Sequence, residues 1–410
     1  MSSDSQQPRR PEGATTDTTA LLLCGARLVD GRTVDVRLKG ARIEAVGTPG
    51  SLDARGTRVD LAGYLLLPAP AEPHAHPDTA LSAEPPGPVS YAPEDVQRRA
   101  TEAALLQLGH GATALRAHVR IGDVQGLASL EAVLQARRAL RGLTELTAVA
   151  VPRLLTGVAG ADGLAMLRDA VKMGAAVVGG CPDLDPDPAG YVEAVLEVAA
   201  EHGCPVDLHT DGDDPARLAR LAAVAGGQRQ GVAIGPCGAL GRLPGDARSR
   251  VADQLAAADV TVVCLPQGGC GGTEVRAVAP ARLLRAAGVR LAAGSGALRD
   301  VANPVGRGDP LESAYLLASQ AGLAPEEAYG AVGSAAREAM GLPAVRVEAG
   351  FPAELLAVRG EGLPGVLSLA YSRIVIHRGR VVARTSAVRE YCDSAAALEL
   401  PRQARPDTRP

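Results

Sequence analysis

The chain has 410 residues, of which 46% are hydrophobic and 21% are charged, and its formal net charge is -4 at pH 7. These values are typical of a soluble globular protein and give no electrostatic reason to expect nucleic acid or a membrane surface as a partner. Aromatic residues make up only 2% of the chain, so a pocket that stacks flat rings on aromatic side chains is hard to build. The length favours one large domain plus a small one.

Neither end of the chain has the pattern of a targeting signal. Residues 1–18 lack the apolar core of a signal peptide and are predicted to be a disordered tail, and residues 391–410 are predicted to be a second, C-terminal tail. No apolar run is long enough to span a bilayer. The seven cysteines are odd in number and dispersed, without a CxxC pair, so we expect reduced thiols in a cytoplasmic protein.

The pattern of strands and helices predicts two folded parts. Residues 19–66 and 345–390 contain short strand-like segments separated by turn residues, which predicts a small β-sandwich domain built from both ends of the chain. Between them, residues 67–344 alternate apolar strand-like runs with Ala/Leu-rich helical segments. Eight strand candidates in this region predict an α/β fold, a closed parallel (β/α)8 TIM barrel. A doubly wound open sheet is the alternative, but a Gly-rich phosphate loop after its first strand is missing.

Two histidines stand at the end of the first predicted barrel strand, in the run Glu72-Pro73-His74-Ala75-His76-Pro77-Asp78. Residues i and i+2 of a strand point the same way, so His74 and His76 face one side at the end where barrel active sites lie. His209 ends the fifth predicted strand at the same mouth, and three imidazoles are a complete protein ligand set for a catalytic zinc. A bound divalent ion would lower the pKa of water and make it a nucleophile. The alternative is a histidine pair that only packs or hydrogen-bonds at a strand end.

Polar residues near other strand ends are further candidates. Asp211 is the acid nearest to His209, and it either orients a ligand or carries a proton, or is a solvated loop acid. His118 ends the second predicted strand and either lines the pocket or is a satisfied core histidine. Asp300 and Asn303 follow the eighth strand, where they would contact a polar substrate or form surface interactions.

The segment from Leu65 to Leu81 resembles the first-strand motif of the cytosine deaminase branch of the amidohydrolase superfamily, in which Glu-Pro-His-x-His-x-Asp is followed by Thr and Leu. Further similarities lie at Leu115–Val119, Asp207–Asp211 and Gly350–Leu355, and they follow the order of the family from about Ala20 to Thr385. The resemblance implies a metal-dependent hydrolase of a non-peptide C–N bond. Its substrate would be a small cyclic amidine or amide, or an aminated heterocycle.

By this resemblance, His74, His76 and His209 carry over as ligands of one divalent metal ion, zinc or iron. Arg153 stands where the family has a Gln that reads the edge of the pyrimidine, so it becomes a substrate-binding candidate beside His118 and Asn303. The partner implied is a small-molecule substrate, and a homo-oligomer is compatible with the sequence. Cytosine itself is a poor expectation, because both the Gln and the aromatic platforms are missing.

The same comparison exposes departures from the family pattern. The proton-carrying Glu of the family corresponds to Gly212, residues 231–237 after the sixth strand contain no His, and the first acid after the eighth strand is Asp300. Asp211 and Asp300 are therefore the candidates for the missing acid–base roles, whose loss costs roughly 10²–10⁴-fold in rate. Three function classes follow: an active hydrolase, a degenerate relative that binds a metal, small molecule or partner without turnover, and a structural partner of an active homologue. The departures favour the second class, whereas the intact histidine triad favours the first.

Overall fold

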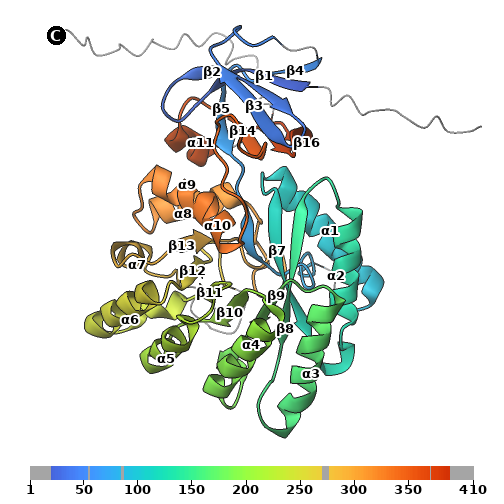
Figure 1. Cartoon of the computed structure of the whole chain (residues 1–410), viewed down its shortest axis with the longest axis vertical. Helices are drawn as coiled ribbons and strands as arrows, with labels where there is room; N and C mark the ends of the chain where they lie inside the picture. Colours follow the sequence, from blue (N-terminus) through green and yellow to red (C-terminus); the bar gives the residue numbers. More distant parts are fainter. Residues whose placement is uncertain (1–19, 54–55, 85–86, 270–276, 370, 388–410) are drawn as a thin grey trace, which may run out of the picture.

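The computed structural model describes residues 20–53, 56–84, 87–269, 277–369 and 371–387 (Figure 1). The predicted tails, 1–18 and 391–410, lie outside these residues. The described chain forms a (β/α)8 barrel and a separate sheet made from both ends, which confirms the predicted architecture. None of the helices in this described part has the length and apolarity that a bilayer span requires.

Eight parallel strands follow one another around the barrel in chain order. Most of their side chains are buried, as expected for strands covered on both faces. The first and last strands meet where Ala75 bridges Gly296 and the Gly296 N–H donates to the His74 carbonyl at 3.0 Å, so the ring is nearly closed. The strands are β6 (Glu72–Ala75), β7 (Ala114–Ile121), β8 (Glu145–Pro152), β9 (Val177–Gly180), β10 (Val206–Thr210), β11 (Val232–Pro236), β12 (Thr261–Cys264) and β13 (Leu291–Ala293).

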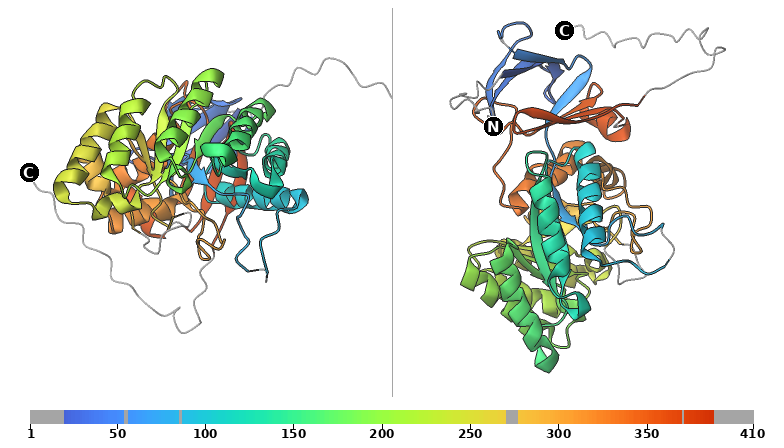
Figure 2. Two further views of the ribbon diagram at one scale, coloured as in Figure 1. Left: turned by 90° about the horizontal axis from the view of Figure 1, so that it is seen from below. Right: turned by 90° about the vertical axis from the view of Figure 1, so that its right-hand side faces the viewer.

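Helices between the strands form the outer layer of the barrel (Figure 2). Their buried Leu, Val and Ala side chains are part of the main hydrophobic core. Several begin with a Pro after an Asp whose carboxylate accepts a backbone N–H, as at Asp187, Asp214 and Asp309, which caps the helix and fixes its start. The helices are α1 (Pro93–Gly109), α2 (Ala128–Ala139), α3 (Gly157–Met173), α4 (Pro188–His202), α5 (Pro215–Ala225), α6 (Gly245–Ala257), α7 (Ala281–Ala286), α8 (Pro310–Ser319), α9 (Pro325–Val332) and α10 (Ser334–Ala339).

The second sheet, called the β domain below, has the strand order β16-β15-β14-β5-β1-β2-β3, with β4 paired to β1. It has a separate apolar core that includes Leu23, Val36 and Ile376. Only residues 69–71 separate β5 from β6, so the β domain lies at the base of the barrel, where the barrel strands begin (Figure 2). Its elements are β1 (Ala20–Arg27), β2 (Thr33–Lys39), β3 (Arg42–Gly47), β4 (Gly56–Asp60), β5 (Tyr64–Pro68), β14 (Leu355–Arg359), α11 (Leu363–Leu369), β15 (Arg373–His377) and β16 (Arg380–Thr385).

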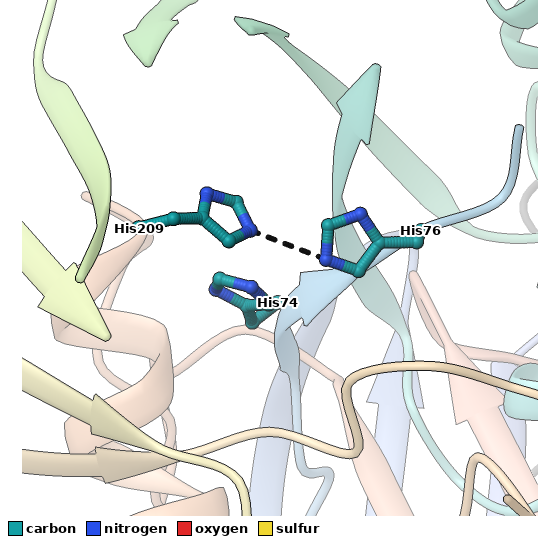
Figure 3. Close-up of side chains that lie close together, drawn as sticks. All are labelled: His74, His76 and His209. Carbon is teal, nitrogen blue, oxygen red and sulfur yellow. Dashed lines mark hydrogen bonds between the residues drawn. The ribbon is translucent and has the colours of Figure 1, made fainter. Parts of the chain in front are cut away.

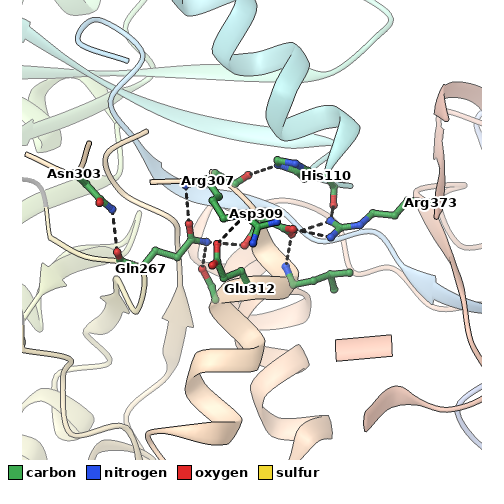
Figure 4. A network of polar contacts seen from close by, with 10 residues as sticks. His110, Gln267, Asn303, Arg307, Asp309, Glu312 and Arg373 are labelled. Atoms are coloured by element: carbon green, nitrogen blue, oxygen red, sulfur yellow. Dashed lines mark hydrogen bonds and ion pairs between the residues drawn. The ribbon is translucent and has the colours of Figure 1, made fainter. Parts of the chain in front are cut away.

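A buried ion pair joins the β domain to the barrel (Figure 4). Arg373 in β15 donates from its two terminal nitrogens to both carboxylate oxygens of Asp309, at 2.8 and 2.6 Å, and Asp309 also caps α8. Burial alone would raise the pKa of Asp309, but the hydrogen bonds and charge of Arg373 outweigh it and lower the pKa below its ordinary value. The carboxylate therefore stays ionised and fixes the guanidinium of Arg373.

We expect D309N to lower the free energy of unfolding by about 3–5 kcal/mol at pH 7, because the buried Arg373 then loses the carboxylate charge that both of its terminal nitrogens contact. Since folding lowers the pKa of Asp309, its contribution is complete above the ordinary value of 3.8 and is lost as the pH falls through the lowered value. Urea unfolding followed by circular dichroism should show the difference between the two proteins shrinking below this pH. The matched control is D187N, at the exposed cap of α4, which should cost less than about 1 kcal/mol. Equal losses in the two variants would refute this account.

Candidate functional site

Four histidines meet near the carboxyl ends of the barrel strands. His74 lies on β6, His76 directly after it, His118 on β7 and His209 on β10. The ring centroids of every pair lie between 4.0 and 5.6 Å apart. This follows from the strand period, because alternate residues of a barrel strand point to the interior. The structure thus brings the three predicted metal ligands together with His118.

His74, His76 and His209 have the geometry of a ligand set (Figure 3). One nitrogen from each lies within 4.8 Å of the others, and the Nε2 atoms of His76 and His209 are 3.2 Å apart. Both ring nitrogens of His74 and Nδ1 of His209 are buried without a hydrogen-bond partner among the described residues. Buried polar atoms nearly always have a partner, so these nitrogens fit a set arranged around an ion. Their role as metal ligands stays a prediction.

The protonation state of the three imidazoles also suits a metal. Burial lowers the pKa of His209 to about 3, and the charge of His118 adds to this effect. Burial likewise lowers the pKa of His74 and His76 well below the ordinary value, and the neighbouring histidines lower it further. All three rings are therefore neutral at pH 7, which is the form that donates a lone pair to a divalent ion.

A buried acid lies behind the triad, between a cation and an imidazole. Asp207 on β10 accepts from Arg116 Nη1 at 2.8 Å, and its other oxygen lies 3.3 Å from His118 Nε2. None of the three side chains is more than 1% exposed. Burial raises the pKa of Asp207, but the charges and hydrogen bonds of His118 and Arg116 outweigh it, so the net shift is downward. Asp207 therefore stays ionised between Arg116 and His118.

A second possible ligand set shares a residue with the first. His74, His118 and Asp207 also offer atoms within 4.8 Å of one another. The charge of Asp207 is already balanced by its ion pair with Arg116, however, so this carboxylate would attract a metal ion less strongly than an unpaired one. The set of His74, His76 and His209 is therefore the better candidate.

Glu72 lies two residues before His74 on the same face of β6 and joins the first strand to the last. Its carboxylate accepts from the Ser295 hydroxyl at 2.5 Å, from the Ser295 N–H and from the His74 N–H. Burial raises the pKa of Glu72 to about 7, against the effect of these hydrogen bonds. A Cβ at Gly294 would lie 2.6 Å from the Glu72 carboxylate, so the chain after β13 approaches this group as closely as a glycine allows.

The two predicted acid–base residues make defined contacts of their own. The Asp300 carboxylate accepts from the Thr79 hydroxyl at 2.8 Å and from the backbone N–H groups of Ala302 and Asn303, and so it caps a turn. Asp211, which is half-buried, donates from its backbone N–H to Asp183 at 3.1 Å. Nothing in these contacts assigns a proton-transfer role, so both roles stay predictions.

The other predicted substrate-binding residues lie on two different loops. Arg153 directly follows β8, is exposed, and lies 3.5 Å from the carboxylate of Asp123. Asn303 is 1% exposed and donates to the Gln267 carbonyl at 2.9 Å, while its own amide oxygen has no partner among the described residues (Figure 4). Of the predicted substrate contacts, His118 alone is shown in contact with the triad.

Sequence reasoning missed Arg120, and it placed Asp78 in the first-strand motif without giving it a role. Arg120 follows His118 by two residues on β7, and its charge adds to burial in lowering the pKa of His76 and His209. Its backbone N–H lies 3.3 Å from the carboxylate of Asp78, whose pKa is raised by burial and whose second oxygen has no partner among the described residues. The strand period was the available signal, since residues 116, 118 and 120 share one face of β7.

Comparison with known proteins decides the family, because the model of the amidohydrolase family matches residues 89–383. The chain belongs to the amidohydrolase family. This confirms the resemblance found in the sequence. A pterin deaminase from Rhizobium rhizogenes is 25% identical to this amidohydrolase over 387 residues, which cover 86% of this chain and 88% of the relative.

Solved structures agree with this assignment. N-isopropylammelide isopropylaminohydrolase from Burkholderia multivorans matches the amidohydrolase with a TM-score of 0.80 at 26% identity, over 90% of this chain and 100% of the other. 5-methylcytosine deaminase from Klebsiella pneumoniae, liganded with phosphonocytosine, matches with a TM-score of 0.80 at 23% identity, over the same shares of both chains. The second likeness supports the fold.

We expect G294A to destabilise the amidohydrolase by about 1–3 kcal/mol, because the added methyl group overlaps the Glu72 carboxylate and the Cβ of His74. Thermal and urea unfolding measure the loss. The matched control is G227A, at a position with open space around the Cβ, which should leave stability within about 0.5 kcal/mol of the parent. A G294A protein as stable as G227A would contradict the close packing described here.

Proposed function

We propose that this amidohydrolase uses one divalent metal ion, zinc or iron, bound by His74, His76 and His209, to hydrolyse a non-peptide C–N bond. The substrate class is a small cyclic amidine or amide, or an aminated heterocycle. The observation that carries the proposal is the meeting of three neutral imidazoles, with buried and unpartnered nitrogens, at the carboxyl ends of barrel strands. Relatives named as a pterin deaminase and an isopropylaminohydrolase support this reaction class.

The residues around the triad have separate tasks in this proposal. A bound divalent ion supplies a Lewis acid and lowers the pKa of a water nucleophile. His118 stacks on His74 with ring centroids 4.0 Å apart, and the Asp207 carboxylate lies 3.3 Å from His118 Nε2, so in this proposal the pair keeps the His74 ring in position. Hydrolysis also needs a proton carrier to the leaving nitrogen.

We assign the proton-carrying task to Asp211, which is half-buried and follows His209 by two residues. Asp300 is a positioning residue in this account, because its carboxylate already accepts from Thr79 and two backbone N–H groups. Arg153 and Asn303 are the proposed substrate contacts from the loops after β8 and β13. Asn303 has an amide oxygen free to accept from a polar substrate.

A relative that binds a metal or small molecule without turnover is the second candidate. One backbone observation favours it. Gly212, the position expected to hold the proton-carrying Glu, has a φ of 72°. Side chains other than glycine are strained in this left-handed region, so the backbone at this position disfavours a Glu.

Protein purified without chelator should contain about one equivalent of zinc or iron per chain, measured by inductively coupled plasma mass spectrometry. H76A and H209A should lose most of it, because each removes one of three ligands. H202A is the matched control, since His202 ends α4 outside the cluster, and it should keep the metal of the parent. A parent protein that binds no zinc or iron even from excess ion would refute the metal site.

The metal-loaded protein should release ammonia or an amine from at least one compound in a panel of aminated pterins, pyrimidines and triazines. D211N should lower kcat by roughly 10²–10⁴-fold without changing the metal content, because it removes a proton carrier and no ligand. D213N, at the exposed acid beside it, should leave kcat unchanged. A stoichiometric metal without turnover across the panel would favour the second candidate.

A further inference from the structure

A cavity of about 200 Å³ lies between the barrel base and the β domain, at the opposite end of the barrel strands from the histidines. The barrel contributes the starts of β7 and β8 and the segment after α10, and the β domain contributes residues of β15 and the residues before β14. A neighbouring hollow of about 230 Å³ shares Glu145, His377 and Arg378 with it. The cavity therefore exists only where the two parts of the chain meet, and it is called the basal cavity below.

Arginines outnumber acids on these walls, and both acids are already engaged. Glu354 contacts His377 Nδ1 at 2.8 Å and accepts from the Arg378 N–H at 3.0 Å. Glu145 forms an ion pair with the Arg378 guanidinium. The remaining arginines on the walls of the basal cavity and the hollow are Arg42, Arg337, Arg137 and Arg141. The walls thus carry an excess of positive charge.

Arg337 is the most unusual of these side chains, because it is only 5% exposed. Its Nε donates to the Pro343 carbonyl at 3.2 Å and its Nη1 lies 3.5 Å from the Thr113 hydroxyl, so both contacts are long and both acceptors are neutral. Within the described ranges Arg337 forms no ion pair with a carboxylate, because Glu354 and Glu145 are paired with His377 and Arg378. Burial lowers the pKa of Arg337, and the more distant charges of Glu354 and Glu145 only partly oppose this shift. A buried cation without a paired counter-charge is costly. An anion beside it would offset that cost.

His377 adds a second unsatisfied group to the same wall. The side chain is 2% exposed, and its Nδ1 is hydrogen-bonded to the Glu354 carboxylate. Its Nε2 is buried and has no hydrogen-bond partner in the described part of the chain. Buried polar atoms of this kind are rare in folded proteins, which indicates that a ligand group reaches this wall of the basal cavity.

We propose that the basal cavity binds a small oxyanion, a phosphate or carboxylate group, through Arg337 and Arg42. The planar guanidinium fork matches the paired oxygens of both groups. Ligand pockets for drug-sized molecules are usually about 300–1,000 Å³, so the smaller basal cavity suits a small anion or the anionic end of a metabolite. Since both parts of the chain line the site, the anion holds the β domain against the barrel base and stabilises the folded chain by mass action.

The test is a thermal melting titration of the full chain with inorganic phosphate and, separately, with malonate, each against sodium chloride at equal ionic strength. We expect a saturable rise of Tm with at least one anion. R42Q should weaken the fitted Kd by about tenfold or more, because it removes a charge-assisted hydrogen bond. R337Q should do the same, and R42Q, at an exposed side chain, keeps the test decisive where R337Q fails to fold.

The matched control is R138Q, an exposed arginine of α2 outside the basal cavity, which should leave the Kd unchanged. A response to phosphate alone identifies a phosphate site, and a response to malonate alone identifies a carboxylate site. The proposal is overturned when neither anion raises Tm saturably, or when R42Q binds as tightly as R138Q. It is equally overturned when H209A abolishes the effect, since the anion then binds at the histidine cluster.

Discussion

The hydrogen bonds that join β6 to the chain after β13 are the constraint on which the rest of the barrel depends. Glu72 accepts from Ser295, and the His74 carbonyl accepts from Gly296, so the first strand is held by the last. This closure sets the direction in which His74 and His76 point. β10 then places His209 across the interior from them. The histidine cluster is thus a product of ring closure, and groups far apart in sequence are fixed by backbone contacts rather than by flexible loops.

The barrel and the triad could be predicted because both depend on local periodicity. Repeated apolar strands and amphipathic helices specify a parallel barrel, and the spacing of His74 and His76 places both rings on one face of a strand. The pairing of Arg116 with Asp207 could not be predicted in the same way, because it depends on which residues of β7 and β10 meet inside the barrel. Arg337 beside the β domain depends on the packing of two separately folded parts, which periodicity does not describe.

The polar interior of this barrel also bears on function. Four imidazoles and a buried ion pair occupy space that apolar side chains would fill more favourably, because buried ionic groups are often no more stabilising than hydrophobic replacements. Unpartnered nitrogens add to that cost. If the site had no function, apolar substitutions in it would raise the stability of the folded chain. The retained cluster therefore supports ligand binding under either candidate function, whereas the glycine at position 212 bears on turnover alone.

The pairing of β5 with β14 has a consequence for synthesis of the chain. β5 pairs along its whole length with β14, which the ribosome makes only after the entire barrel sequence. Asp309 likewise gains its ion-pair partner only when Arg373 has been synthesised. The N-terminal strands must therefore remain incompletely paired, with exposed edges, throughout translation of the barrel. A nascent chain of this protein is most vulnerable to association with other chains during that interval, and it is released from this exposure only when its last strands dock.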